Sequence, residues 1–212
     1  DPNPTKIEKL DYHASTSAEL SLSVKALSLK LTAKGNSSGA EHITTTHEDG
    51  SKDVLTTVRY NDRTAVVDSQ QDAAGNPKRP PELAVTLNRL HPEYAKSLEE
   101  VYTGSKPSLK GDQDVTLRFN PNEAMALRDA AYRSLRDLNA EWGIQGTEFE
   151  KQLADPYGML QGDFNLRELA RARTFEDVAA AMTAGITNAE GFTEMLLGLA
   201  IDSGLRLPGR FG

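Results

Sequence analysis

The segment SAELSLSVKALSLKLTAKG, Ser17 to Gly35, carries the clearest secondary-structure signal in the chain and decides which fold class the sequence predicts. An apolar residue stands at every second position up to Val24, and after a shift of one residue leucine does so again from Leu27 to Leu31. Alternation with a period of two indicates a β-strand, because a helix would spread these side chains around its circumference. We therefore expect one long strand over residues 18–34. A β-bulge at Ala26 would return both leucine runs to one face.

The residues that follow predict more antiparallel strands. GNSSG (35–39) and EDGSKD (48–53) are typical of turns, and the segment between them is rich in β-branched residues. Two further alternating segments flank Asn61-Asp62, which is a two-residue hairpin signal. Residues 18–70 are thus predicted to form a four-stranded antiparallel meander.

A change in composition follows the meander. Residues 72–83, DAAGNPKRPPEL, contain three prolines and a glycine among polar residues, which predicts a linker. LAVTLNRL (83–90) and HPEYAKSLEEVYTG (91–104) are interpreted as helices, and DVTLRF (114–119) as one returning strand. The predicted organisation is a β-rich meander over 1–71, a linker over 72–83 and a helical region over 84–212. The alternative is one composite domain in which strand 114–119 joins the meander.

Helix-start signals dominate the chain after residue 119. A capping residue is followed three positions later by an acid, which satisfies free amides of the first helical turn and favours the positive end of the helix dipole. The pairs are Asn120/Glu123, Thr147/Glu150, Asn165/Glu168, Thr174/Asp177 and Thr187/Glu190. The first of these helices has a predicted buried stripe at Leu127, Ala131, Leu135, Leu138 and Trp142. The fold class is therefore α+β, an N-terminal antiparallel β-meander followed by a mainly helical C-terminal part with one returning strand.

Composition excludes several classes of function. The 212 residues include no cysteine, which excludes disulfides, thiolate catalysis and zinc–thiolate sites. The net charge of −7 has the wrong sign for binding nucleic acid. The longest apolar run, Met195 to Ile201, is too short for membrane insertion, which needs about 20 residues.

The negative charge is concentrated in the second half. Residues 1–111 carry 14 basic and 15 acidic side chains, a net charge of −1, whereas residues 112–212 carry 10 basic and 16 acidic ones, a net charge of −6. We therefore expect the main partner contact in the second half, along the helices between Asn120 and Gly204.

The setting of the protein is inferred from weaker features. The chain begins Asp1-Pro2 without a methionine, which suggests a processed mature protein or a domain cut from a longer chain. Cysteine-free strands rich in serine and threonine fit an exported protein. The expected localisation is therefore secreted or extracytoplasmic.

The stretch EHITTTHEDG, Glu41 to Gly50, holds the densest group of possible metal ligands in the chain. On a strand, His42 and His47 point to opposite faces and cannot converge on one ion. We therefore predict a hairpin without a metal, and no cofactor.

Other candidate sites are weighed against simpler interpretations. GNSSG matches the nucleophile-elbow pattern at Ser37, but that elbow requires a helix after the serine, and a strand is predicted there. Asp112 and Asp114 share a strand face, which fits a carboxylate pair or, more simply, a solvated edge. Arg167 and Arg171, four residues apart on a predicted helix, are a candidate contact for an anion or an acidic partner, although Glu168 offers an internal partner.

No catalytic constellation follows from these residues, and the catalytic residues stay unknown. The sequence predicts a non-catalytic interaction or assembly module of an exported or apparatus-associated protein, with a protein partner. The alternative is a small cofactor-free enzyme, a hydrolase or secreted effector. It would use a histidine, His47 or His91, beside carboxylates brought together by the fold.

Overall fold

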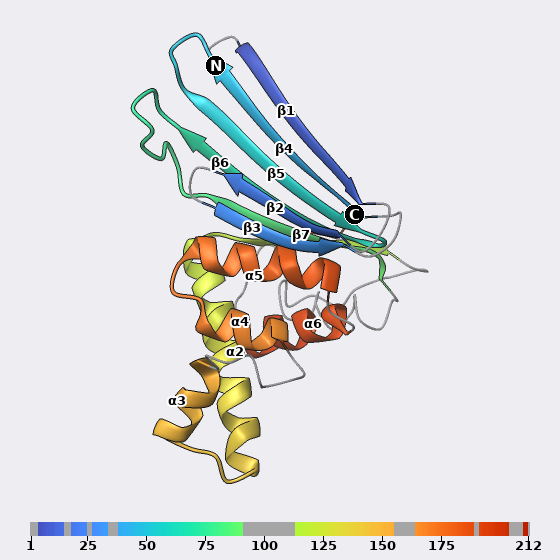
Figure 1. The fold of residues 1–212 in the computed structure, drawn as a ribbon, viewed down its shortest axis with the longest axis vertical. Coiled ribbons are helices and arrows are strands. Elements are labelled where there is room, and N and C mark those ends of the chain that lie inside the picture. The colour runs from blue at the N-terminus through green and yellow to red at the C-terminus, as the bar shows by residue number, and fades with distance from the viewer. Residues whose placement is uncertain are drawn as a thin grey trace.

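The computed structural model describes residues 4–14, 18–24, 27–33, 38–90, 113–154, 164–188, 191–203 and 210–211. It confirms the α+β class, with antiparallel strands in the N-terminal part and mainly helices in the C-terminal part (Figure 1). The strands are β1 (Pro4–Ala14), β2 (Ala18–Val24), β3 (Leu27–Ala33), β4 (Ser38–His47), β5 (Lys52–Tyr60), β6 (Arg63–Gln71), β7 (Glu82–Leu90), β8 (Gln113–Phe119) and β9 (Arg210–Phe211). The helices are α2 (Pro121–Glu141), α3 (Thr147–Ala154), α4 (Phe164–Arg171), α5 (Phe175–Asn188) and α6 (Phe192–Asp202).

The main sheet is an antiparallel meander extended at both ends. Within the described residues, seven strands pair in the order β1-β4-β5-β6-β7-β8-β9. The predicted hairpin at Asn61-Asp62 is confirmed, since Tyr60 pairs with Arg63 across it. Asn61 has a φ of 50°, a left-handed conformation that asparagine tolerates better than most residues.

The leucine-rich segment is a hairpin, so the prediction of one bulged strand is wrong. β2 pairs with β3 in a separate two-stranded sheet, with Leu20 opposite Leu31 and Leu22 opposite Leu29. When two residues separate antiparallel strands, each even-numbered residue of the first strand stands opposite an odd-numbered residue of the second, as Leu22 stands opposite Leu29. The one-residue shift in the leucine alternation therefore reflects the register of the β2–β3 pair, in which the leucines of the two strands stand opposite one another.

The strands that make up the meander therefore differ from those predicted. The hairpin does not pair with β4; instead β1, which the sequence analysis did not predict, occupies that position. β3 lies against α5, on the side of the main sheet where α5 also meets β5 and β6 (Figure 1). A strand does follow residue 37, as expected, but β3 and β4 are not hairpin partners.

The segment LAVTLNRL is strand β7, and its interpretation as a helix is wrong. Leu83, Val85 and Leu87 are buried, each pairs with a buried residue of β8, and all belong to the core that the helices share. Their spacing of two fits a strand, and β6 and β8 on either side supply the hydrogen bonds. The ladder shifts register between Leu87 and Leu90, where Arg89 has a φ of 54° and its N–H donates to Asp114 Oδ1 at 2.9 Å.

The returning strand is confirmed and joins the meander as β8, directly beside β7. Residues 72–81 connect β6 to β7, and these two strands pair within the same sheet. Strands from both sides of the predicted linker thus share one hydrogen-bonded ladder. The predicted helix over residues 91–104 lies outside the described residues.

Two of the predicted helix caps are confirmed by side-chain hydrogen bonds. Asn120 Oδ1 accepts from Glu123 N at 2.8 Å while Glu123 Oε1 accepts from Asn120 N at 3.1 Å. Thr174 and Asp177 make the same reciprocal pair, with both distances at 3.2 Å. Thr187 is not a cap, because it lies within α5; Gly191, with a φ of 70°, precedes α6 instead.

The remaining two predicted caps lie inside their helices. Thr147 is the first residue of α3, and the helix-opening carbonyl belongs to Gly146, which accepts from Glu150 N. Asn165 is the second residue of α4. The capping patterns therefore located these two helices, but each pattern placed the start of its helix at least one residue too late.

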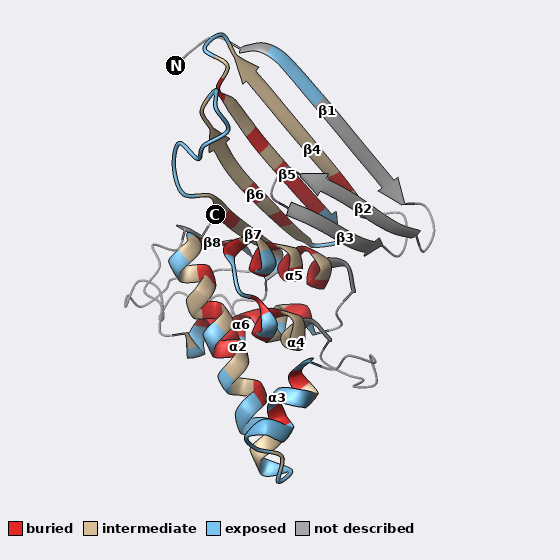
Figure 2. Cartoon of the chain, turned by 60° about the vertical axis from the view of Figure 1, so that its left-hand side comes forward, coloured by how far each residue is buried: buried red, intermediate tan, exposed pale blue. Residues whose placement is uncertain are grey.

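One core joins the two layers. The helix-facing side of the sheet contributes buried residues of β5 to β8, and helices α2, α4, α5 and α6 cover them with their apolar faces (Figure 2). The largest fully buried side chains are Phe119, Phe192, Leu83, Leu87, Leu117, Leu127, Leu169, Met182 and Ile186. The β4–β5 turn and the α2–α3 turn lie at opposite ends of the molecule (Figure 1).

Candidate functional site

The last turns of α2 and all of α3 form a projection from the helical layer, which we call the arm (residues 136–154; Figure 1). Trp142, Gly143 and Ile144 donate backbone hydrogen bonds to the carbonyls of Asn139 and Ala140, which ends α2 in a tight turn. Gly143 and Gly146 have φ values of 79° and 60°, a region where a side chain would be strained. Glycine at these positions allows the chain to reverse and begin α3.

Aromatic packing holds α3 against α2. Phe149 is buried, and its ring meets the ring of Tyr132 edge-on, with centroids 5.5 Å apart and planes at 78°. The Tyr132 hydroxyl donates to the Glu150 carboxylate, and this hydrogen bond raises the pKa of Tyr132. The Arg128 guanidinium lies 5.3 Å from the centroid of the same ring. The arm is therefore anchored to the part of α2 that belongs to the core.

The outer surface of the arm is apolar where the sequence predicted a buried stripe. Leu127, Ala131 and Leu135 are buried as predicted, but Leu138 is 46% exposed and Trp142 is 79% exposed. The interpretation of the last two as core residues is wrong, because α2 extends beyond the helices that cover its earlier turns. A solvent-exposed tryptophan, the only one in the chain, thus lies in the hydrogen-bonded turn that ends α2.

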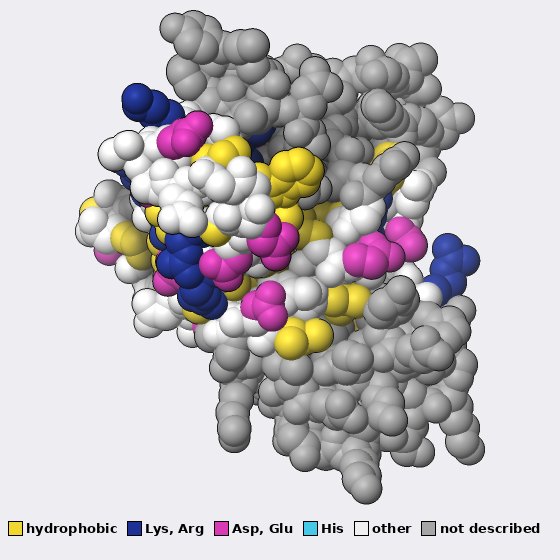
Figure 3. All heavy atoms as spheres, turned by 90° about the horizontal axis from the view of Figure 1, so that it is seen from below, with side chains coloured by type: hydrophobic (Ala, Val, Ile, Leu, Met, Phe, Trp, Pro, Cys, Tyr) yellow, Lys and Arg dark blue, Asp and Glu magenta, His cyan; other side chains and the backbone are white. Residues whose placement is uncertain are grey.

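The arm also carries charged residues of both signs. The arm carries four acidic side chains and two basic ones, Asp137, Glu141, Glu148, Glu150, Arg136 and Lys151. Viewed from the side of the arm, hydrophobic side chains are interspersed with both signs of charge (Figure 3). An apolar centre with a charged rim is typical of protein-binding surfaces.

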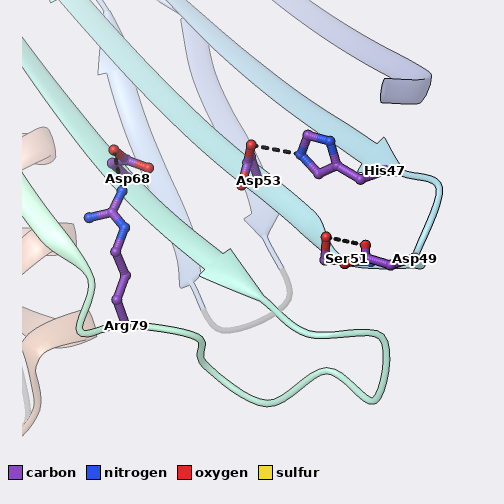
Figure 4. Close-up of polar contacts among 6 residues, drawn as sticks. All are labelled: His47, Asp49, Ser51, Asp53, Asp68 and Arg79. Carbon is purple, nitrogen blue, oxygen red and sulfur yellow. Dashed lines mark hydrogen bonds and ion pairs between the residues drawn. The ribbon is translucent and has the colours of Figure 1, made fainter. Parts of the chain in front are cut away.

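A second cluster of chemical groups lies at the β4–β5 turn (Figure 4). His47 Nε2 lies 2.8 Å from Asp53 Oδ2, and the His47 side chain is mostly buried. The Ser51 hydroxyl donates to Asp49 Oδ1 at 2.5 Å, and this bond together with the Ser51 N–H holds the pKa of Asp49 below its usual value. A histidine thus lies beside carboxylates, but the nearby serine hydroxyl is directed to Asp49 rather than to the imidazole.

The two histidines of the stretch Glu41–Gly50, His42 and His47, lie on opposite faces of β4, as the strand alternation predicted. His42 Nδ1 is 3.0 Å from Thr56 Oγ1 on the helix-facing side, and burial lowers the pKa of His42. His47 contacts Asp53 on the other side. Among the residues that the structure describes, no three histidine or carboxylate side chains are grouped so that they could hold a metal ion.

The predicted arginine pair, Arg167 and Arg171, lies on α4. Arg171 Nη1 forms an ion pair with Glu168 Oε1 at 3.1 Å, the internal partner that the sequence analysis considered. Arg167 shares the helix, and its Nε atom is buried. A contact of these two arginines with an anion or an acidic partner remains a prediction.

Other candidates are placed only in part. Asp114 accepts the Arg89 N–H described above, whereas Ser37, His91 and Asp112 lie outside the described residues. Sequence reasoning missed the arm surface. Its available signal was a lone tryptophan at the end of an apolar stripe, followed at once by glycine.

No helix in the described ranges is both long enough and apolar enough to cross a membrane. Comparison of the chain with protein-family models, with curated proteins and with solved structures finds no match.

Proposed function

We propose that this chain is a non-catalytic interaction or assembly module of an exported or apparatus-associated protein, and that it binds a protein partner through the arm. The observation that carries the proposal is the 79% exposure of Trp142 beside the exposed Leu138. Tryptophan is enriched among the residues that dominate binding energy at interfaces. Burying its large apolar surface in a partner's pocket releases free energy in proportion to the area removed from water.

The charge around the arm indicates the character of the partner. With four acidic and two basic residues the arm has a net charge of −2, within a half of the chain whose net charge is −6. An apolar pocket with a basic rim would complement this surface, and its association should slow as salt rises. The acidic surface also disfavours a nucleic acid as the partner.

Affinity capture from the native source, with matched variants, tests the proposal. Trp142→Ala should lose the captured protein while retaining the wild-type unfolding transition, because this side chain is exposed. Gln145→Ala, an exposed residue of the same turn, should capture as wild type does. The isolated partner should shift the fluorescence emission of Trp142 to shorter wavelength. Equal capture by wild type and Trp142→Ala would show that the arm is not the binding surface.

The His47–Asp53 pair supports a second candidate, a small cofactor-free enzyme such as a hydrolase or secreted effector. A carboxylate that holds an imidazole is a component of general-base catalysis. The geometry favours this candidate less, since the Ser51 hydroxyl donates to Asp49 and not to the imidazole. If a hydrolytic activity is found, Asp53→Asn should reduce it by a factor of ten or more and Trp142→Ala should not.

A further inference from the structure

Strand β1 leaves one long edge of the main sheet without a neighbouring strand among the described residues. It spans 11 residues and, among the strands that the structure describes, pairs with β4 alone, at the end of the strand order. Such an edge presents backbone N–H and C=O groups that can pair with another chain. Ile7, one of the few β1 residues whose side chain is described, is 65% exposed.

The regular part of β1 limits how another strand can add to it. The ladder with β4 shifts register between Pro4 and Lys6, which sets Thr5 apart as a bulge. From Lys6 to Ala14 the pairing runs without interruption over nine positions. A partner strand would therefore meet a straight template with the sequence KIEKLDYHA.

Symmetry restricts the pairing of this template with its own copy. A two-fold axis perpendicular to the sheet keeps every side chain on its original face, and opposed residues in a ladder also share a face. One residue must consequently stand opposite its own copy. Centring on Lys6, Glu8, Lys9 or Asp11 would set a charge against an identical charge, which is destabilising.

Among the uncharged positions, Leu10 gives the longest complementary ladder. It is the midpoint of the nine regular positions, whereas centring on Ile7 would bring the Thr5 bulge into the new ladder. About Leu10, Lys9 stands opposite Asp11 twice, and no like charges face each other along the strand. Lys6 and Glu8 stand opposite Ala14 and Tyr12, and these two charges already form an ion pair within β1 at 2.6 Å.

We propose that β1 pairs antiparallel with β1 of a second copy of this chain, centred on Leu10, so that the two main sheets become one continuous sheet. The occupant of the edge is a second copy because the charge sequence of the strand complements itself in this register. Continuous backbone pairing and a leucine at the axis supply the attraction, and the two Lys9–Asp11 contacts select the register. This self-association uses a different surface from the arm.

Charge-reversal variants of the purified chain test the register by sedimentation velocity and native mass spectrometry. Lys9→Glu alone makes acidic side chains face each other, and Asp11→Lys alone makes basic ones do so. Each should weaken the dimer at least about tenfold. Mixed together, the two variants should form a heterodimer of near wild-type affinity, because both contacts are then complementary. This rescue also shows that both variants are folded.

Lys6→Glu and Glu8→Lys are the matched controls, because they change neighbouring charges on β1 that face uncharged residues in the proposed register. Their dimers should match wild type, and Trp142→Ala should also dimerise normally. A chain that stays monomeric into the high micromolar range overturns the proposal. Insensitivity to the Lys9 and Asp11 reversals overturns it as well. Selective heterodimerisation of the Lys6 and Glu8 variants instead would place the axis at Ile7 and refute the Leu10 register.

Discussion

The two ends of α2 share one apolar stripe but have different surroundings. Near its start, Leu127 is fully buried among the helices and strand β8, and Asn120 caps the helix. Near its end, Leu138 and Trp142 continue the stripe into solvent. The difference shows that helical periodicity states which residues share a face, whereas burial depends on whether another element covers that face. An apolar stripe that runs beyond its intramolecular partners is a candidate surface for another protein.

The largest effect should come from truncating the stripe at its covered end. Leu127→Ala should lower the free energy of unfolding by about 2–5 kcal/mol, since it leaves a cavity in the core. Leu138→Ala removes the same atoms from an exposed site and should cost less than about 1 kcal/mol. Urea unfolding of both variants measures the difference. Similar losses at the two positions would mean that the arm is packed as tightly as the core.

An intermediate effect is expected at the capped start of α2. Asn120→Ala removes the side-chain acceptor of the Glu123 N–H and should cost about 1 kcal/mol. Asn122→Ala, an exposed asparagine of the same first turn, makes a matched control and should cost less than about 0.5 kcal/mol. Thermal unfolding of the two variants gives the comparison. If both asparagines matter equally, the reciprocal Asn120–Glu123 cap is not what stabilises this end.

The smallest effect should be the pH dependence of stability that comes from His42, which lies on the covered face of the sheet. Burial lowers the pKa of His42 below its ordinary value of 6.5, so the unfolded chain binds the proton more readily than the folded chain does. Stability should therefore decrease as the pH falls below 6.5 and level off below the folded-state pKa. In His42→Gln this part of the pH dependence should be missing. Unfolding free energies of both proteins between pH 8 and pH 5 measure it, and identical slopes would contradict the assignment.

Local patterns predicted much of the fold because they depend on neighbouring residues. The Asn61-Asp62 turn, the strand containing Val115 and Leu117, and the caps at Asn120 and Thr174 are all formed by groups within a few positions of one another. The opposite orientation of the two histidines on β4 likewise follows from strand geometry alone.

The failures arose where one pattern fits two structures. A one-residue shift between leucine runs fits either a bulged strand or a hairpin with a two-residue connection. The observed pairing of Leu22 with Leu29 shows the hairpin. The pattern of LAVTLNRL fits both a helix and a strand because the segment is short and apolar, and its pairing with β6 and β8 makes it a strand.

The sequence by itself determined the α+β class, the starts of the best-capped helices and the alternation of faces along the strands, because these depend on local backbone geometry and on the period of apolar residues. Only the tertiary structure decided that β1 lies beside β4, that residues 83–90 extend the sheet and that Trp142 stands in solvent. Each of these features depends on whether an element distant in sequence packs against the residues concerned. The periodicity of side chains shows which residues share a face but does not show which distant element covers that face.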